Sequence, residues 1–501
     1  MSTNANIAAQ FLAVAAEQGS KPFLIEHGET VLTFADLESR TGRLAARLQT
    51  LGGKPGERIV VQIDKSPDNV LLYLAALRLG IIYVPLNTAY TAAELAYFIG
   101  DAEPVVVVCR PGDELSVREL AGAARVVTLG PAGDGSLFDS IPENPAPVAH
   151  CGADELAVIL YTSGTTGRSK GAMLSHGNLA SNALTLKDYW RWSSDDVLIH
   201  ILPIYHVHGL FVALHGALLA GATMLFHRGF DPAQVIAEFA SATVLMGVPT
   251  HYTRLTATDH LTPEACRSMR LFVSGSAPLL AEAHQRFEEK TGHRILERYG
   301  MTETGMICSN PYHAERVAGT VGYALPGEEV RICDEQGSAV KQGEPGVLEV
   351  CGPNVFKGYW RNPEKTSEDI RADGFFITGD IATMAADGRV TLVGRAKDLI
   401  ISGGLNIYPK EIEEAIDALP GVDESAVIGL PDADFGEAVV AIVAHQKGAD
   451  VQEEAVKTAL QDQLARFKQP RRVVVVESLP RNAMGKVQKA ALRQEYARLL
   501  D

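Results

Sequence analysis

The strongest chemical signal in this sequence is a loop of hydroxyl side chains and glycines between two apolar segments. Residues Tyr161 to His176 read YTSGTTGRSKGAMLSH. Such a loop lets backbone N–H groups approach a polyphosphate closely, and it adds hydroxyl donors and one cation, Lys170. It is not a Walker A loop, because that motif requires Gly-Lys-Ser/Thr and Lys170 follows Ser169. The pattern predicts phosphate binding outside the P-loop class.

A second signal is a charge at a position where a small or apolar residue is expected. The segment HRILERYGMTETG, His293 to Gly305, begins as a short apolar strand and ends as a loop of hydroxyls and glycines, with Arg298 at the junction. A buried guanidinium needs a partner. Arg298 is either a satisfied structural cation or a residue that binds an anion from outside the chain.

Two histidines, His206 and His208, stand in the segment PIYHVHG after a strand-like run. No third ligand supports a metal site there, and a lone histidine is usually a satisfied structural residue. The residues themselves therefore leave both histidines without an assigned role.

These residues must be positioned by regular elements, and the first half of the chain alternates strand-like and helical segments. Residues 58–64 and 81–87 read as strands, and residues 66–80 read as a helix capped by Ser66. A second helix over 91–104 begins with the capping box of Thr91 and Glu94, and residues 105–109 form the next strand. The alternation predicts layered sheets with helical crossovers.

The pattern of apolar and turn-forming residues changes in the second half of the chain. From about 317 to 393, short apolar runs are separated by Gly, Pro and Asp, which predicts a compact β subdomain of hairpins. Residues 394–404 form a charged segment flanked by glycines and are the expected linker. The remaining hundred or so residues contain helices over 409–419 and 453–467 and three strands, enough for a small α+β domain.

Bulk properties limit the classes of protein and of partner. A chain of 501 residues exceeds the size at which one hydrophobic core stops growing, so at least two domains are expected. The net charge of −16 repels nucleic acid and anionic lipid, and we expect neither as a partner. An anionic substrate must therefore be bound by a local cluster of cations.

Cysteine usage and the N-terminal segment indicate a cytoplasmic protein. The six cysteines are dispersed, without a CxxC pair, which favours reduced thiols. The N-terminus lacks a basic region and reads as an amphipathic helix, not as a signal peptide. The longest apolar stretch, Val197 to Phe226, is interrupted by four histidines and by glycines, and we expect it to be buried core beside a functional loop.

Five motifs in a fixed order give the chain a family resemblance. YTSGTTGRSKGAML, RYGMTETG, TGD (Thr378 to Asp380), GRAKDLI (Gly394 to Ile400) and PRNAMGKVQK (Pro480 to Lys489) resemble the motifs of the adenylate-forming acyl-CoA synthetase superfamily. The resemblance covers nearly the whole chain. It implies an α/β plus α+β fold: a large N-terminal domain of two β-sheets with flanking helices and a β-barrel subdomain, residues 1–394, and a small mobile α+β C-terminal domain, residues 395–501.

The family chemistry assigns roles to residues at matching positions. The resemblance implies Mg²⁺ held by Thr165 and Glu303, a catalytic cation at Lys486, a hinge at Lys397 and an acyl-pocket or gating residue at His206. It implies that Gly403 and Gly404 leave room for the pantetheine of coenzyme A. The residues expected to contact ATP are Thr162, Ser163, Gly164, Thr166, Gly167, Lys170, Gly275, Ser276, Ala277, Glu297, Tyr299, Thr302 and the ribose-binding pair Asp380 and Arg395.

The family resemblance also implies where the Arg298 side chain points. Its neighbours Glu297 and Tyr299 match positions that frame adenine, so Arg298 should project toward the acyl pocket. Arg254 and Ser274 stand in segments that form other walls of that pocket. Cations beside a centre that activates a carboxylate imply a substrate with a second carboxylate.

Among the branches of the family the sequence looks most like malonyl-CoA synthetases, through the segments NTAY, VLMGVPT, SGSAPL and YPKEIE. The expected activity is ATP-dependent ligation of malonate to coenzyme A. A ligase for methylmalonate or another short acid stays open. So do two readings of other classes, a P-loop-type phosphotransferase and a non-catalytic nucleotide-binding protein.

Overall fold

The computed structural model describes residues 4–162, 169–277, 279–402, 405–432, 435–461, 463–482 and 485–500. The chain divides into two compact units. The first comprises Met1–Ala318, Gly322–Glu329 and Cys351–Phe376, and the second comprises Gly319–Val321, Val330–Val350 and Ile377–Asp501. Among the described residues, no helix is long and apolar enough to cross a membrane.

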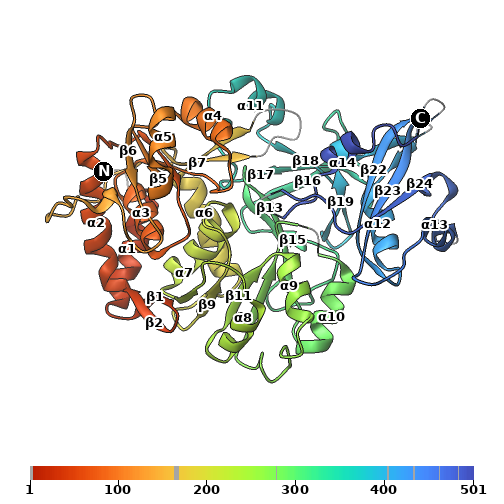
Figure 1. Ribbon diagram of the computed structural model, residues 1–501, viewed down its shortest axis with the longest axis horizontal. Helices are drawn as coiled ribbons and strands as arrows, with labels where there is room; N and C mark the ends of the chain where they lie inside the picture. Colours follow the sequence, from red (N-terminus) through yellow and green to blue (C-terminus); the bar gives the residue numbers. More distant parts are fainter. Residues whose placement is uncertain are drawn as a thin grey trace. The chain divides into compact units, whose positions relative to one another are not determined.

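The first unit is built on two sheets (Figure 1). The six-stranded sheet has the order β6-β5-β3-β4-β7-β8, and its neighbouring strands are parallel except for β7 with β8. Its strands are β3 (Arg58–Gln62), β4 (Ile82–Pro85), β5 (Val106–Cys109), β6 (Arg125–Thr128), β7 (Leu156–Thr162) and β8 (Lys170–Ser175).

The nine-stranded sheet has the order β15-β14-β13-β12-β11-β9-β10-β1-β2. The strands from β13 to β1 in this order run parallel, and β2, β14 and β15 are antiparallel additions at the two edges. Its strands are β1 (Pro22–Glu26), β2 (Glu29–Thr33), β9 (Val197–His200), β10 (Thr223–Phe226), β11 (Val244–Gly247), β12 (Leu271–Ser274), β13 (Leu296–Met301), β14 (Gly305–Ser309) and β15 (Tyr323–Ala324).

Helices gather around both sheets of the first unit (Figure 1). They are α1 (Ile7–Gln18), α2 (Phe34–Thr50), α3 (Pro67–Arg78), α4 (Ala92–Ala102), α5 (Glu114–Leu120), α6 (His176–Tyr189), α7 (Leu214–Ala220), α8 (Pro232–Glu238), α9 (Pro249–Thr256), α10 (Ala281–Thr291) and α11 (Pro363–Asp369). The apolar stretch expected to be core becomes β9, a π-helical turn His208–Ala213, α7 and β10, which confirms that expectation.

The helix starts expected from the sequence are confirmed in detail. Ser66 caps α3 by accepting a hydrogen bond from the Asn69 N–H at 3.2 Å. Thr91 and Glu94 form the expected capping box of α4. The apolar face of α4 packs into the core of the six-stranded sheet, with Phe98 1% exposed. Because each cap satisfies N–H groups that have no partner within the helix, these starts are fixed locally.

The second unit contains two further sheets (Figure 1). The β-rich segment expected near 317–393 forms a sheet of four strands, β16 (Glu329–Cys333), β17 (Gly346–Cys351), β18 (Phe376–Met384) and β19 (Val390–Arg395). The last sheet joins β20 (Ile400–Ser402), β21 (Leu405–Ile407), β22 (Val422–Asp432), β23 (Gly436–His445) and β24 (Arg472–Val476), accompanied by α12 (Pro409–Asp417), α13 (Glu453–Gln461) and α14 (Lys489–Glu495).

One helix is shorter than expected. The sequence predicts a helix over 453–467, but α13 ends at Gln461, and Asp462 lies outside the described residues. The Gln469 side chain donates to the carbonyl of Leu464 at 2.9 Å and to that of Gln461 at 3.4 Å. These bonds satisfy carbonyls that a longer helix would have used, so the side chain of Gln469 ends the helix early.

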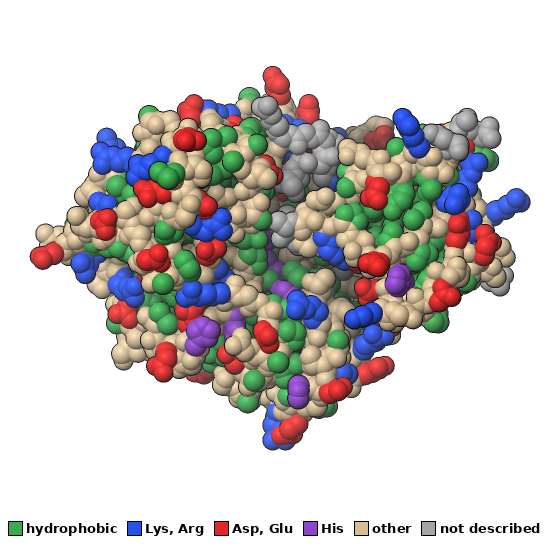
Figure 2. All heavy atoms as spheres, viewed as in Figure 1, with side chains coloured by type: hydrophobic (Ala, Val, Ile, Leu, Met, Phe, Trp, Pro, Cys, Tyr) green, Lys and Arg blue, Asp and Glu red, His purple; other side chains and the backbone are tan. Residues whose placement is uncertain are grey.

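Charged side chains of both signs are mixed on the surface. Figure 2 shows Lys and Arg scattered among Asp and Glu on the visible face of the protein.

All six cysteines are free, and five of them are buried. The expectation of reduced, dispersed thiols is therefore confirmed.

Candidate active site

Several polar residues of the first unit that could bind a ligand lie at or near the ends of strands in the nine-stranded sheet. Ser274 closes β12, His200 closes β9, and Glu297 and Arg298 lie in β13. In the nine-stranded sheet the chain continues from β9 to β10 on one side and to β11 on the other, so the strand order reverses there. Ligands of open α/β sheets bind outside the carboxyl ends of strands at such a point.

Arg298 is buried against a glycine. Its side chain is 3% exposed. A Cβ on residue 275 would lie 2.4 Å from Arg298 Cζ, so the absence of a side chain at Gly275 makes room for the guanidinium. Arg298 Nε and Nη2 have no hydrogen-bond partner among the described residues, and burial lowers the pKa of the guanidinium. The charge is therefore desolvated without a counter-ion from the described chain.

Two other buried polar side chains, Ser274 and His208, also have atoms without a partner among the described residues. Ser274 is fully buried, and its Oγ has no partner among the described residues. His208 is 2% exposed, its Nδ1 lies 3.3 Å from Ser276 Oγ, and its Nε2 has no partner in the same part of the chain. Burial first, and the Arg298 charge second, hold the pKa of His208 well below its ordinary value, so the ring is neutral. The pocket offers hydrogen-bond donors and a cation to an anion from outside.

Other candidates for this pocket are placed differently. His206 is half-buried, and its Nδ1 accepts a hydrogen bond of 3.5 Å from the His208 N–H. Arg254 is exposed on α9, with Cζ 5.0 Å from the ring centroid of Phe230. Phe230 in turn packs on His251, with their ring centroids 4.3 Å apart. The binding roles of Arg254 and His206 stay predictions.

Glu303, Tyr359 and Lys170 form a second group. The Tyr359 hydroxyl donates to Glu303 Oε1 at 3.1 Å, and both residues are buried. Lys170 Nζ lies 4.2 Å from the ring centroid of Tyr359 and 4.0 Å from Asp369 Oδ2. Sequence reasoning brought Lys170 and Glu303 into one site but missed Tyr359, because an isolated tyrosine in the segment FKGYW carries no motif that marks it.

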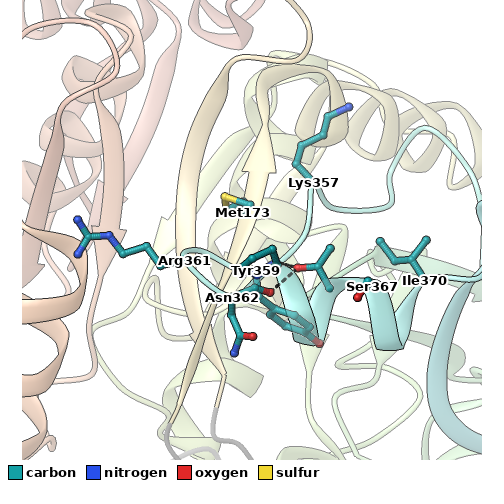
Figure 3. Close-up of a pocket in the computed structure, with 9 residues that line it drawn as sticks. Met173, Lys357, Tyr359, Arg361, Asn362, Ser367 and Ile370 are labelled. Carbon is teal, nitrogen blue, oxygen red and sulfur yellow. Dashed lines mark hydrogen bonds between the residues drawn. The ribbon is translucent and has the colours of Figure 1, made fainter.

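Strand pairing explains why Tyr359 reaches that position. Backbone hydrogen bonds join Met173 to Gly358 at 3.0 Å and Gly171 to Trp360 at 2.7 Å, so residues 357–360 extend the sheet edge beyond β8. Figure 3 shows the Tyr359 ring beside α11, where the Tyr359 N–H donates to Thr366 Oγ1 at 2.9 Å. An open surface cavity of about 520 Å³ lies on this side.

The loop predicted to bind phosphate is described only at its ends. Thr162 pairs with Lys170 across β7 and β8, and Thr162 Oγ1 donates to the Lys170 carbonyl at 3.4 Å. Several predicted residues lie outside the described residues: Ser163, Gly164, Thr165, Thr166, Gly167, Gly403 and Gly404. The expected adenine frame follows β12 in Gly275, Ser276 and Ala277 and continues in β13 with Glu297 and Tyr299, after which Thr302 and Glu303 follow.

The second unit holds the remaining candidates. Asp380 Oδ1 accepts a charge-assisted bond of 2.7 Å from Arg395 Nε, and the two residues are paired across β18 and β19. This brings the predicted ribose pair together. Lys397 lies in the 3₁₀ turn Ala396–Asp398, and burial lowers the pKa of its ammonium.

Lys486 belongs to a tight turn. Its N–H donates to Asn482 Oδ1 at 2.9 Å, and its carbonyl accepts from the Asn482 N–H at 2.9 Å. Ion pairs of Arg481 with Glu424 and of Lys489 with Glu413 hold the two sides of the turn. The backbone around Lys486 is therefore fixed by contacts on both sides.

Comparison with known proteins identifies the family of this chain. Residues 11–360 match the family "AMP-binding enzyme", and residues 411–486 match "AMP-binding enzyme C-terminal domain". A feruloyl-CoA synthase of an Amycolatopsis species is 35% identical over 476 residues, covering 94% of this chain and 95% of its own length. The human mitochondrial malonate–CoA ligase ACSF3 is 36% identical over 521 residues, covering 94% of this chain and 89% of its own length.

A solved structure is similar throughout. ATP-bound MatB from Rhodopseudomonas palustris has a TM-score of 0.97 and 53% sequence identity, with 100% of both chains covered. The expected adenylate-forming fold, with a large N-terminal and a small C-terminal domain, is thereby confirmed. The chain belongs to the family of AMP-binding enzymes.

Proposed function

We propose that this protein is an acyl-CoA synthetase that ligates malonate to coenzyme A. One malonate carboxylate attacks the α-phosphorus of ATP and pyrophosphate leaves, which gives malonyl-adenylate. The thiol of coenzyme A then gives up its proton and attacks the acyl carbon, and AMP leaves with the bonding electrons. The second carboxylate of malonate keeps its charge throughout both steps.

The buried, unpartnered guanidinium of Arg298 is the observation that carries the proposal. Its Nε and Nη2 have no partner among the described residues, and neither has Nε2 of His208, whose ring is close enough for the Arg298 charge to lower its pKa. Leaving a charge buried without a partner is costly, and a bound carboxylate removes that cost by accepting two N–H bonds. A substrate with a second carboxylate supplies that anion.

Overall identity does not choose between substrates, because the feruloyl-CoA synthase and the human malonate–CoA ligase are 35% and 36% identical to this chain. The pocket does favour one. An aromatic tail such as that of ferulate offers no anion to Arg298, and it would bury the guanidinium still further. A malonate–CoA ligase is among the relatives of this chain, and its substrate is of the dicarboxylate class that the guanidinium favours.

The phosphates and their metal ion would be held by the first unit. Mg²⁺ prefers hard oxygen ligands, and the buried Glu303 carboxylate, positioned by the Tyr359 hydroxyl, fits that preference. We assign Glu303 and Thr165 as the residues that would hold the ion, which neutralises charge on the phosphates of ATP. Lys170 and the loop from Thr162 onward would contact the same phosphates.

The second unit would complete the catalytic cycle. Asp380 and Arg395 would bind the ribose hydroxyls, and Lys486 would stabilise the charge that develops on the α-phosphate. The proposed boundary between residues 1–394 and 395–501 lies close to Lys397. A pivot at Lys397 would withdraw Lys486 after the first step and bring Gly403 and Gly404 to the pantetheine. Six free cysteines fit the cytoplasmic setting that we propose.

A substrate panel tests the proposal. Acetate, malonate, methylmalonate, succinate, octanoate and ferulate are each supplied with ATP, Mg²⁺ and coenzyme A, and AMP and thioester are measured. Malonate should give the highest kcat/KM. Best turnover of methylmalonate or of a short monocarboxylate would move the assignment to that acid. Release of ADP would identify a phosphotransferase, and no turnover of ATP would indicate a binding protein.

Substitution of Arg298 connects the panel to the pocket. Removal of the partner of a buried charge costs about 3–5 kcal/mol, which lowers the kcat/KM for malonate by about two to three orders of magnitude in Arg298→Ala. Butyrate turnover should hold steady or improve. Arg254→Ala should change both values in the same direction but more weakly. Arg294→Ala, an exposed arginine paired with Glu288, is the matched control. An equal loss for both acids would show that Arg298 serves ATP or the fold.

A further inference from the structure

Behind the loop that carries Glu303, a side-chain amide holds the backbone. Asn354 Nδ2 donates to the carbonyl of Thr304 at 2.7 Å and to that of Met306 at 3.3 Å. Asn354 is 1% exposed and Thr304 is fully buried. The carbonyl of Glu303 itself accepts from the Phe356 N–H at 2.8 Å, two residues after Asn354. The segment around Asn354 therefore holds the backbone carbonyls of Glu303, Thr304 and Met306.

These bonds determine which way the Asn354 amide faces. Its NH₂ group must point to Thr304 and Met306, because two carbonyl oxygens cannot donate to an amide oxygen. Asn354 Oδ1 consequently points to the opposite side. That oxygen is buried and has no hydrogen-bond donor among the described residues.

A carboxyl oxygen meets Asn354 Oδ1 on that side. A Cβ on residue 352 would lie 2.1 Å from Glu328 Oε2 and 2.6 Å from Asn354 Oδ1, so both oxygens occupy the space left by Gly352. Glu328 Oε2 is also buried and without a partner among the described residues. Two buried acceptor oxygens thus lie around the same point beside Gly352, and neither has a donor among the described residues.

A proton resolves this conflict. We propose that Glu328 is a neutral carboxylic acid that donates its proton to Asn354 Oδ1 and thereby positions the loop that carries Glu303. The inference rests on the proposed function, because that function gives Glu303 its role. Glu328 touches no substrate in this scheme and acts through Asn354, so it is a positioning residue.

The electrostatics of the pocket support a neutral Glu328. Burial raises the pKa of its carboxyl to about 8, the first and largest cause. Cys308 on β14 is a titratable neighbour, and its thiol pKa is raised by burial first and by Glu328 second. No ion pair joins Glu328 to a cation among the described residues. The contact with the Asn354 side chain lowers this pKa, but by less than burial raises it, so the net shift favours the protonated form.

A direct O–H···O bond would satisfy both oxygens. The small cavity next to Asn354 does not extend between them. It is lined by Leu174, Asn178, Leu179, Asn182, Ala183, Phe211, Thr304 and Gly305, and neither Glu328 nor Gly352 lines it.

Infrared difference spectroscopy tests the protonation of Glu328, first on the wild-type protein and then on its variants. A C=O stretch of a buried protonated carboxylic acid should be present at pH 7 and should disappear as the pH rises through about 8. Asp417, whose pKa is raised to about 7, also contributes to this band, so the part that belongs to Glu328 is the part missing from Glu328→Gln. Glu329→Gln, which alters the exposed neighbouring carboxylate, should keep the full band. An identical band in the wild type and Glu328→Gln would overturn the proposal.

The pH profile of adenylation tests the positioning role. Pyrophosphate release with malonate is measured from pH 6 to 10 in the wild type, Glu328→Gln and Glu329→Gln. The Gln amide still donates to Asn354 Oδ1 and does not ionise. From pH 7 to pH 9 the wild type and Glu329→Gln should lose about tenfold more rate than Glu328→Gln, because a group with a pKa of about 8 is about 90% ionised at pH 9.

Three further outcomes separate the positioning role of Glu328 from unfolding and from the proposed function. The same alkaline loss in Glu328→Gln as in the wild type would refute the positioning role, and near-ultraviolet circular dichroism at pH 9 would identify unfolding as a separate cause. If the wild type released no pyrophosphate with malonate, the proposed function would fail. The infrared band would still decide the protonation of Glu328.

Discussion

The guanidinium of Arg298 lies against the backbone of Gly275, so closely that a Cβ on residue 275 would stand 2.4 Å from Arg298 Cζ. Gly275 directly follows β12 and Arg298 lies within β13, and these neighbouring parallel strands pair at Ser274 and Glu297. A glycine at 275 is thus a condition for a buried arginine at 298. The presence of the Arg298 charge in the pocket depends on the small size of residue 275, which follows the adjacent strand.

Gly275→Ala should therefore displace Arg298. We expect the kcat/KM for malonate to fall at least about tenfold, while the value for butyrate falls less, because only malonate needs the guanidinium in place. The check is the ratio of the two kcat/KM values. Gly100→Ala, at a helical site where a Cβ would meet nothing within 4 Å, is the matched control. An unchanged ratio in Gly275→Ala would separate Arg298 from the choice of substrate.

Tyr359→Phe should weaken the use of ATP with little effect on the fold. It removes the 3.1 Å hydrogen bond to Glu303 but keeps the ring beneath Lys170. A hydrogen bond to a charged group contributes about 1.5–3 kcal/mol, so the kcat/KM for MgATP should fall about 10- to 100-fold. Initial rates at varied MgATP measure this. A loss confined to thermal stability, with normal kinetics, would refute the role of Tyr359. Tyr496→Phe, in the second unit, is the control.

Lys486→Ala should divide the reaction into its two steps. Pyrophosphate release should fall by about two orders of magnitude or more, because an ammonium no longer faces the α-phosphate. Conversion of supplied malonyl-adenylate and coenzyme A to thioester should stay near the wild-type rate. Lys447→Ala, an exposed lysine of the same unit, is the control. Equal losses in both steps would contradict a role limited to adenylation.

Asp417→Asn should stabilise the protein at alkaline pH. Burial first, followed by the charges of Glu413 and Glu424, raises the pKa of the Asp417 carboxyl from 3.8 to about 7. The folded state therefore holds a proton that the unfolded state releases, and stability decreases as the pH rises from about 4 through 7. The variant removes this decrease.

Urea unfolding at pH 5 and pH 8 measures the effect of Asp417→Asn. Between these two pH values, the variant should lose roughly 1–3 kcal/mol less stability than the wild type. Asp423→Asn changes an exposed carboxylate on the neighbouring strand and should behave like the wild type. Parallel losses in all three proteins would show that Asp417 is ionised at neutral pH in the folded state.

The sequence by itself determined the local elements and the chemistry of the family. The caps of α3 and α4 could be predicted because Ser66 and Thr91 satisfy N–H groups only three residues away. The order of five motifs identified the superfamily, since phosphate loops and turns are encoded in consecutive residues. Arg298 was recognised as unusual from its position alone.

The tertiary structure decided which groups lack partners. Gly275 and Arg298, or Glu328 and Asn354, stand on different strands and turns, and only the packed fold shows that each pair shares one space. His208 and Tyr359 enter their sites through contacts with Ser276 and Glu303, which lie far along the chain. Arg254, expected beside Arg298, is exposed over Phe230. Burial and hydrogen-bond satisfaction are properties of long-range packing, so no local pattern in the sequence can specify them.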